Sequence, residues 1–163
     1  MSGRIVFVEP HPGQSPREAS NHETFLVDLG LPCQLGCVAC ERRAVHPSPS
    51  ALDVARRRLL LAAEHESVAT VRAVFYGGEP FGAPGAIARL ANEVRTACRH
   101  RGAAFEPYLI STGVAWSAEG AALFSAAGVR RVQVTLAGTR EVHDRLRPMK
   151  DGGGSFDVIL RSL

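Results

Sequence analysis

Three of the four cysteines lie within eight residues, in a CxxxCxxC pattern formed by Cys33, Cys37 and Cys40. They follow an apolar segment, residues 25–29, that we expect to form a β-strand. Three thiolates on one short loop can bind three irons of a cubane iron–sulfur cluster. The fourth iron would then have no protein ligand and would be open to another molecule.

Zinc is the main alternative for this loop. A structural zinc site normally has four protein ligands, and the loop supplies three. His46, six residues after Cys40, could be the fourth ligand. Cys37 and Cys40 also form a CxxC pair of the kind found in thioredoxin-type redox sites, but such a pair leaves Cys33 unexplained. We favour a cluster because it uses all three cysteines and needs no fourth ligand.

A second polar motif, Gly77-Gly78-Glu79-Pro80, follows the next expected strand, residues 71–76. Glycines leave the backbone uncovered, so a ligand can approach it closely. The carboxylate of Glu79 can accept hydrogen bonds from an ammonium group. The motif is also compatible with an ordinary turn, but its position at the end of a strand favours a ligand site near the cysteine loop.

The remaining sequence alternates strands with helices. We expect strands at residues 25–29, 71–76, 105–112 and 129–136, helices between them, and a last helix after Ser155. Ser50 with Asp53, Ser117 and Ser155 are the expected helix caps. This order predicts an α/β fold with parallel strands, which gathers the polar motifs at one edge of the sheet. We expect residues 1–24 to be an N-terminal segment with one short strand at 5–8. Cys98 lies on the apolar face of an expected helix, and we expect it to be buried.

Composition narrows the class of protein. With 163 residues, 45% of them hydrophobic and 21% charged, the chain fits one globular domain. No apolar run approaches the ~20 residues of a membrane span, and the N-terminal run is too short for a secretory signal, so we expect no membrane partner and a cytoplasmic location. The net charge is only +3, and we expect Arg56–Arg58 to lie on a solvated helix face, so nucleic acid is not an expected partner.

Taken together, the motifs resemble those of the radical SAM superfamily, and in particular the core of the peptide-modifying enzymes of the sulfatase-maturase and SPASM type. The resemblance covers residues 25–163. Beyond the two motifs above, it rests on four further segments: Ile110-Ser111-Thr112-Gly113, Val134 to Gly138, Val142 to Pro148, and Lys150 to Asp157.

The resemblance implies a [4Fe-4S] cluster on the three cysteines, with S-adenosyl-L-methionine chelating the open iron. Reductive cleavage of that cofactor would give a 5′-deoxyadenosyl radical, which abstracts hydrogen from a peptide or protein substrate. A flavodoxin- or ferredoxin-like electron donor is implied as well. The cofactor-binding residues that the resemblance implies are Gly77, Gly78, Glu79, Pro80, Ser111, Thr135 and Arg147.

The radical SAM barrel has six strand–helix units, and this chain supplies about four. We therefore expect a partial (β/α) barrel, similar to a TIM barrel, with residues 25–163 as a truncated core. The apolar pattern of the last helix still runs at Leu163, which also suggests an incomplete barrel. An open fourth strand favours a partner chain or a dimer that completes the barrel. The alternatives to a self-sufficient enzyme are a cofactor-binding module that needs such a partner and a zinc-binding structural domain.

Overall fold

The computed structural model describes residues 21–40 and 50–163. The expected strand at residues 5–8 and the expected zinc ligand His46 lie outside these ranges. The described elements are, in order: β1 (His22–Asp28), α1 (Ser50–Glu64), β2 (Thr70–Tyr76), η3 (Pro80–Gly82), α2 (Pro84–Arg101), β3 (Ala104–Ser111), α3 (Ala118–Ala126), β4 (Arg131–Val134), α4 (Arg140–Leu146) and α5 (Phe156–Ser162).

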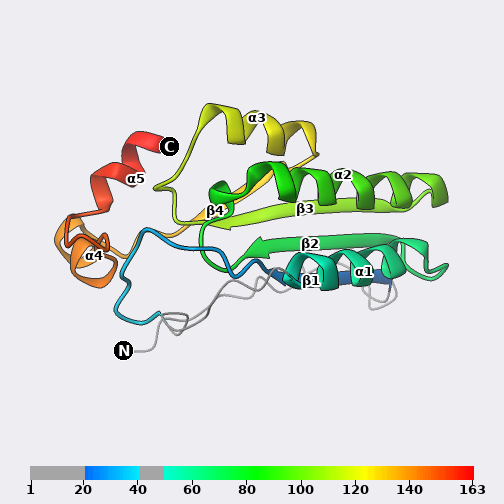
Figure 1. Cartoon of the computed structure of the whole chain (residues 1–163), viewed down its shortest axis with the longest axis horizontal. Helices are drawn as coiled ribbons and strands as arrows, with labels where there is room; N and C mark the ends of the chain where they lie inside the picture. Colours follow the sequence, from blue (N-terminus) through cyan, green and yellow to red (C-terminus); the bar gives the residue numbers. More distant parts are fainter. Residues whose placement is uncertain (1–20, 41–49) are drawn as a thin grey trace, which may run out of the picture.

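The four strands form one parallel sheet in the order β1-β2-β3-β4. Successive strands are joined through helices, as expected for right-handed crossovers. The helices α1, α2 and α3 cover the sheet, with α2 between the other two (Figure 1). The partial α/β barrel predicted from the sequence is therefore present, and the carboxyl ends of the strands share one edge.

The main core lies between one face of the sheet and these helices. Alternate strand residues such as Val71, Phe75 and Leu109 are fully buried there, because successive side chains of a strand point to opposite faces. Phe81 packs against Trp116 and Phe124, with ring centroids 4.7 and 5.1 Å apart, and this joins η3 to α3. Cys98 is also fully buried in this core, as its place in the apolar stripe of α2 predicted.

The opposite face of the sheet has no helix layer among the described residues. Leu26 of β1 is 58% exposed there. Arg72 of β2 and Glu106 of β3, which are partners in register, form an ion pair on this face, with 3.0 Å between Nε and Oε2. This arrangement corresponds to the open lumen side of a partial barrel.

Several expected boundaries differ from the observed ones. β4 is half as long as expected, and helix α4 occupies a segment for which we expected no regular structure. Ser117 caps α3 as predicted, with its Oγ 3.1 Å from the amide of Gly120. The side chain of Ser155 does not cap α5, because its hydroxyl donates to the Arg147 carbonyl instead. Asp144 provides the cap.

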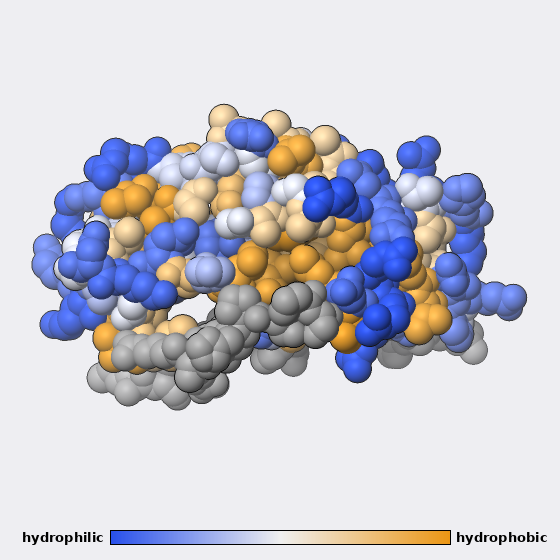
Figure 2. Space-filling view, viewed as in Figure 1, coloured by the Kyte–Doolittle hydropathy of each residue, from blue (hydrophilic) through white to orange (hydrophobic). Residues whose placement is uncertain are grey.

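The helices α4 and α5 lie beyond the sheet, on the side toward which β2 and β3 point (Figure 1). In the same view, hydrophilic residues cover much of that end, whereas apolar residues gather nearer the middle of the molecule (Figure 2). Within residues 21–40 and 50–163, no helix is both long and apolar enough to cross a membrane.

Candidate functional site

The cysteine loop continues directly from β1 and pairs with the turn that follows β2. The amide of Leu29 donates to the Tyr76 carbonyl at 2.8 Å, and that of Leu31 to the Gly77 carbonyl at 3.1 Å. In return, the amide of Glu79 donates to the Pro32 carbonyl at 3.3 Å. The parallel pairing of the two strands thus extends past their ends and holds the first cysteine beside the Gly-Gly-Glu turn.

The two glycines of this turn allow the loop to approach. Both have positive φ, 88° at Gly77 and 85° at Gly78, a conformation that side chains disfavour. A Cβ on Gly77 would lie 2.1 Å from Oδ1 of Asp28, and one on Gly78 would lie 1.8 Å from the Leu31 carbonyl oxygen. The side left uncovered by these glycines is therefore filled by the start of the cysteine loop.

Glu79 is fully buried and its carboxylate joins two turns. Oε1 accepts hydrogen bonds from the Phe81 amide at 3.0 Å and from the Ser111 hydroxyl at 2.8 Å. Oε2 accepts from the Thr112 amide at 2.8 Å and also from the Thr112 hydroxyl. Four donors fill the usual acceptor sites of a carboxylate, so Ser111 acts here by binding Glu79. Pro80 is buried beside it as the first residue of η3.

A second segment, residues 146–150, packs on the opposite edge of the cysteine loop; we call it the clamp segment. It runs antiparallel to the loop through a bridge between Leu35 and Met149. The Gly36 amide donates to the Pro148 carbonyl at 2.7 Å, and the Lys150 amide to the Gln34 carbonyl at 2.9 Å. A third bond, 2.9 Å long, joins the Val38 amide to the Leu146 carbonyl. This pairing was not predicted, since it uses backbone groups that leave no pattern in the sequence.

Cys33, Cys37 and Cys40 form no disulfide, and all three are partly buried. The amide of Leu35 donates to the Cys33 sulfur at 3.4 Å. Burial raises the pKa of the Cys33 thiol, the Leu35 amide lowers it, and the nearby Cys37, Glu79 and Cys40 raise it further. Cys37 and Cys40 therefore lie close enough to Cys33 to act on it electrostatically.

The donor set suits a cluster that takes one thiolate per iron. In the part of the chain that the structure describes, no three His, Cys, Asp or Glu side chains gather around one point as ligands of a single ion. The zinc alternative stays untested, because its candidate fourth ligand, His46, is outside the described ranges.

Arg147 and Thr135 reach the same end of the sheet by different routes. Arg147 is the C-cap of α4 and belongs to the clamp segment, so it lies next to the cysteine loop. Its Nε is buried and has no hydrogen-bond partner among the described residues. Thr135 follows Val134, the last residue of β4, and is partly buried. A spare buried donor is costly, so the Arg147 Nε indicates that an acceptor belongs at this position.

Solved structures share this arrangement of strands and helices. The enzyme anSMEcpe with bound AdoMet and the Cp18Cys peptide superposes with a TM-score of 0.70 at 19% identity, over 86% of this chain and 38% of that one. A histidine-tagged form of anSMEcpe with bound AdoMet gives 0.69 at 19% identity, over 86% and 39%. These proteins are anaerobic sulfatase-maturating enzymes of the radical SAM type. This chain therefore shares the fold of these structures over the matched region.

The radical SAM resemblance of the sequence motifs is thus confirmed at the level of the fold. The chain spans about two fifths of the length of these structures. No family model matches the sequence, and no curated protein matches it.

Proposed function

We propose that this chain is the core of a radical SAM enzyme, with Cys33, Cys37 and Cys40 as the ligands of a [4Fe-4S] cluster. The observation that carries the proposal is the double anchoring of the cysteine loop. Backbone hydrogen bonds hold it to the Gly-Gly-Glu turn on one edge and to the clamp segment on the other. A loop fixed along both edges is preorganised to hold three ligands, which lowers the entropy cost of binding a cluster.

The residues around the cysteines would tune the cluster. The Leu35 amide already donates to the Cys33 sulfur, and amide–sulfur hydrogen bonds adjust both thiolate basicity and cluster potential. The partial burial of all three cysteines limits contact with water, and solvent exposure is another factor that sets the potential.

The methionyl end of S-adenosyl-L-methionine would lie among Gly77, Gly78, Glu79, Thr135 and Arg147. A cluster held by the three cysteines would supply one-electron reduction of this cofactor. Because the oxygens of Glu79 are occupied by protein donors, we assign it a role through its charge: a buried carboxylate attracts the cationic end of the ligand.

Arg147 would bind the cofactor's carboxylate. Its guanidinium is always charged, and its buried Nε has a hydrogen to donate. The hydroxyl of Thr135 is the second donor that we assign to that carboxylate.

A peptide or protein is the proposed substrate, and the exposed face of the sheet is the surface that would receive it. A flavodoxin- or ferredoxin-like protein would supply the electron. Among the described strands, β1 and β4 are the edges of the sheet, and we propose that a partner chain or a second copy pairs with one of them to complete the barrel.

Anaerobic reconstitution with iron and sulfide, followed by dithionite and S-adenosyl-L-methionine, tests the proposal. We expect stoichiometric cluster and the release of 5′-deoxyadenosine. Cys33→Ala should abolish cluster loading, whereas Cys98→Ala, which removes the buried core cysteine, should leave the iron content unchanged. Stoichiometric zinc without iron or sulfide in anaerobically purified protein would instead favour the zinc-binding domain.

The position of β1 and β4 at the two edges of the described sheet supports a second candidate, a cofactor-binding module that is active only with a partner chain. In that case the reconstituted chain binds cluster and cofactor but releases no 5′-deoxyadenosine by itself. Light scattering would then detect association with a second copy or with an added partner.

A further inference from the structure

His143 is a fully buried histidine outside the cysteine loop, and it connects three segments around the site. Its Nδ1 accepts a hydrogen bond from the Ala137 amide at 3.0 Å, just past β4. Its Nε2 lies 2.9 Å from Oγ of Ser155, at the start of α5. Oγ of Ser155 in turn donates to the Arg147 carbonyl at 2.6 Å.

These bonds determine the protonation state of His143. Ser155 has one hydroxyl hydrogen, and it is used on the Arg147 carbonyl, so Nε2 of His143 must be the donor in the pair. Nδ1 faces an amide hydrogen and must be unprotonated. The imidazole is therefore neutral, and a protonated ring would lose the bond to Ala137.

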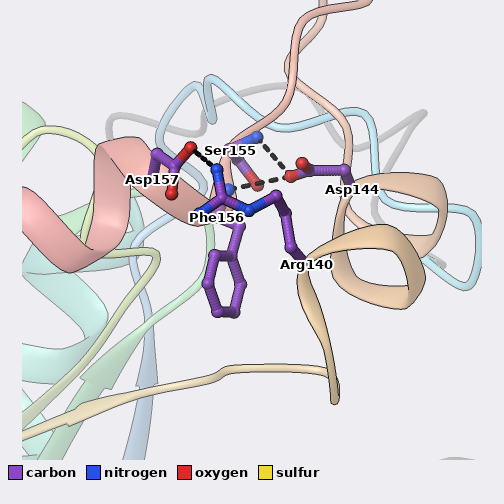
Figure 3. A network of polar contacts seen from close by, with 5 residues as sticks. All are labelled: Arg140, Asp144, Ser155, Phe156 and Asp157. Atoms are coloured by element: carbon purple, nitrogen blue, oxygen red, sulfur yellow. Dashed lines mark hydrogen bonds and ion pairs between the residues drawn. The ribbon is translucent and has the colours of Figure 1, made fainter.

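Ser155 is held from a second direction by Asp144. Oδ1 of Asp144 accepts hydrogen bonds from the amides of Ser155 and Phe156, both 2.8 Å long, and so caps α5 (Figure 3). The side chain of Arg140 pairs with Asp157 and lies over the Phe156 ring, 5.6 Å from its centroid, which adds a further link between α4 and α5. The hydroxyl of Ser155 thus has a fixed position in which to bind the Arg147 carbonyl.

We propose that His143 and Ser155 are positioning residues that hold Thr135 and Arg147 in register with each other and keep the clamp segment on the cysteine loop. Ala137, which binds His143, is two residues from Thr135, and Arg147, which binds Ser155, lies in the clamp segment itself. The imidazole of His143 and the hydroxyl of Ser155 therefore connect the segment after β4 to the clamp segment. The link to cofactor binding rests on the proposed function, whereas the link to the clamp segment rests on the hydrogen bonds alone.

Ser155→Ala removes the hydroxyl that links His143 to Arg147. Ser162→Ala is the matched control, because Ser162 is at the other end of α5 and its hydroxyl also has backbone carbonyls as acceptors, those of Gly113 and Ile159. Hydrogen exchange of the backbone amides, measured in the protein without cofactor, shows directly whether the clamp segment stays paired with the cysteine loop. We expect the amides of Gly36 and Lys150 to exchange about tenfold faster in Ser155→Ala, as for the loss of one net hydrogen bond, and to be unchanged in Ser162→Ala.

Equilibrium binding of S-adenosyl-L-methionine to the reconstituted protein provides the second measurement. We expect the affinity to fall about tenfold in Ser155→Ala, with unchanged iron content, and to be retained in Ser162→Ala. His143→Asn keeps an acceptor for the Ala137 amide but loses contact with Ser155, so the amides of Gly36 and Lys150 should exchange faster in this variant as well. It replaces Ser155→Ala in the experiment if that variant does not fold.

The two measurements test the link to the clamp segment and the link to cofactor binding separately. Unchanged exchange at Gly36 and Lys150 in both variants, or equal effects of Ser155→Ala and Ser162→Ala, would overturn it. Faster exchange with unchanged cofactor affinity would overturn the link to the cofactor. If the wild-type protein loads iron yet binds no S-adenosyl-L-methionine, the proposed function fails, and the exchange data still decide whether His143 and Ser155 hold the clamp segment.

Discussion

The hydroxyl of Ser111, the last residue of β3, donates a 2.8 Å hydrogen bond to the carboxylate of Glu79, in the turn that follows the neighbouring strand β2. With the bonds from Thr112, it makes Glu79 a buried connection between the ends of β2 and β3. Glu79 also lies in the turn that supports the cysteine loop. The stability of the sheet edge and the geometry of the candidate site therefore depend on one carboxylate.

Glu79→Gln should destabilise the fold. An amide has one acceptor oxygen in place of two, and its NH₂ group would face the donors of Thr112, so at least one buried donor loses its partner. We expect a loss of about 1–3 kcal/mol in the free energy of unfolding, measured by urea titration with Trp116 fluorescence. Glu93→Gln, which breaks the exposed ion pair with Arg56, should change little. Equal effects of the two substitutions would contradict the role assigned to Glu79.

Gly78→Ala should be far more harmful than Gly152→Ala. Both glycines have positive φ, 85° and 89°, so both variants incur the strain of a left-handed residue, about 1–2 kcal/mol. A Cβ at Gly152 meets open space, whereas one at Gly78 would overlap the Leu31 carbonyl. The extra loss in unfolding free energy for Gly78→Ala should be accompanied by reduced iron loading, because the cysteine loop must move. Similar unfolding midpoints for the two variants would rule out this close approach.

Much of this arrangement is readable from the sequence, because it follows from apolar periodicity. The alternation of strands and helices, the burial of Cys98 and the convergence of the polar motifs at one edge all rest on patterns of period two or 3.6. Those features match the observed fold. The glycine turn was also identified, although the sequence did not indicate that the cysteine loop itself fills the space left by Gly78.

The parts that escaped prediction depend on contacts between segments. Helix α4 is short and mostly polar, and it is stabilised by the burial of His143 against α5. The clamp segment pairs with the loop through backbone groups, which any residue carries. The cap of α5 comes from Asp144, eleven residues before Ser155, so a search for a local capping residue finds the wrong side chain.

Asp144→Ala should destabilise α5. The loss of the two hydrogen bonds to the amides of Ser155 and Phe156 should lower the unfolding free energy by about 0.5–2 kcal/mol, the range measured for helix caps. Asp157→Ala, which removes an exposed carboxylate from the first turn of the same helix, is the control and should have a smaller effect. A larger loss from Asp157→Ala would show that Asp144 is not the cap.

His143 should make stability depend on pH. Burial and the nearby Arg147 lower the pKa of His143 below 6.5, and Asp144 opposes this shift. A lowered pKa in the folded state means that the unfolded chain binds the proton more readily, so this contribution is complete above pH 6.5 and is lost as the pH falls through the folded-state pKa. Its slope cannot exceed about 1.4 kcal/mol per pH unit.

Urea unfolding of the wild type and of His143→Asn at several pH values between about 5 and 8 measures this effect. The difference between their unfolding free energies should grow as the pH rises toward 6.5 and then level off. A constant difference across this range would mean that His143 is not held neutral by the fold.

The most direct test of the central claim is the metal content of the anaerobically reconstituted chain together with its response to S-adenosyl-L-methionine. The account predicts about four irons and four sulfides per chain, lost in Cys33→Ala, Cys37→Ala and Cys40→Ala, and a change in the electron paramagnetic resonance spectrum of the reduced cluster when the cofactor is added. A chain that retains iron in all three cysteine variants, or whose cluster spectrum does not respond to the cofactor, would contradict it.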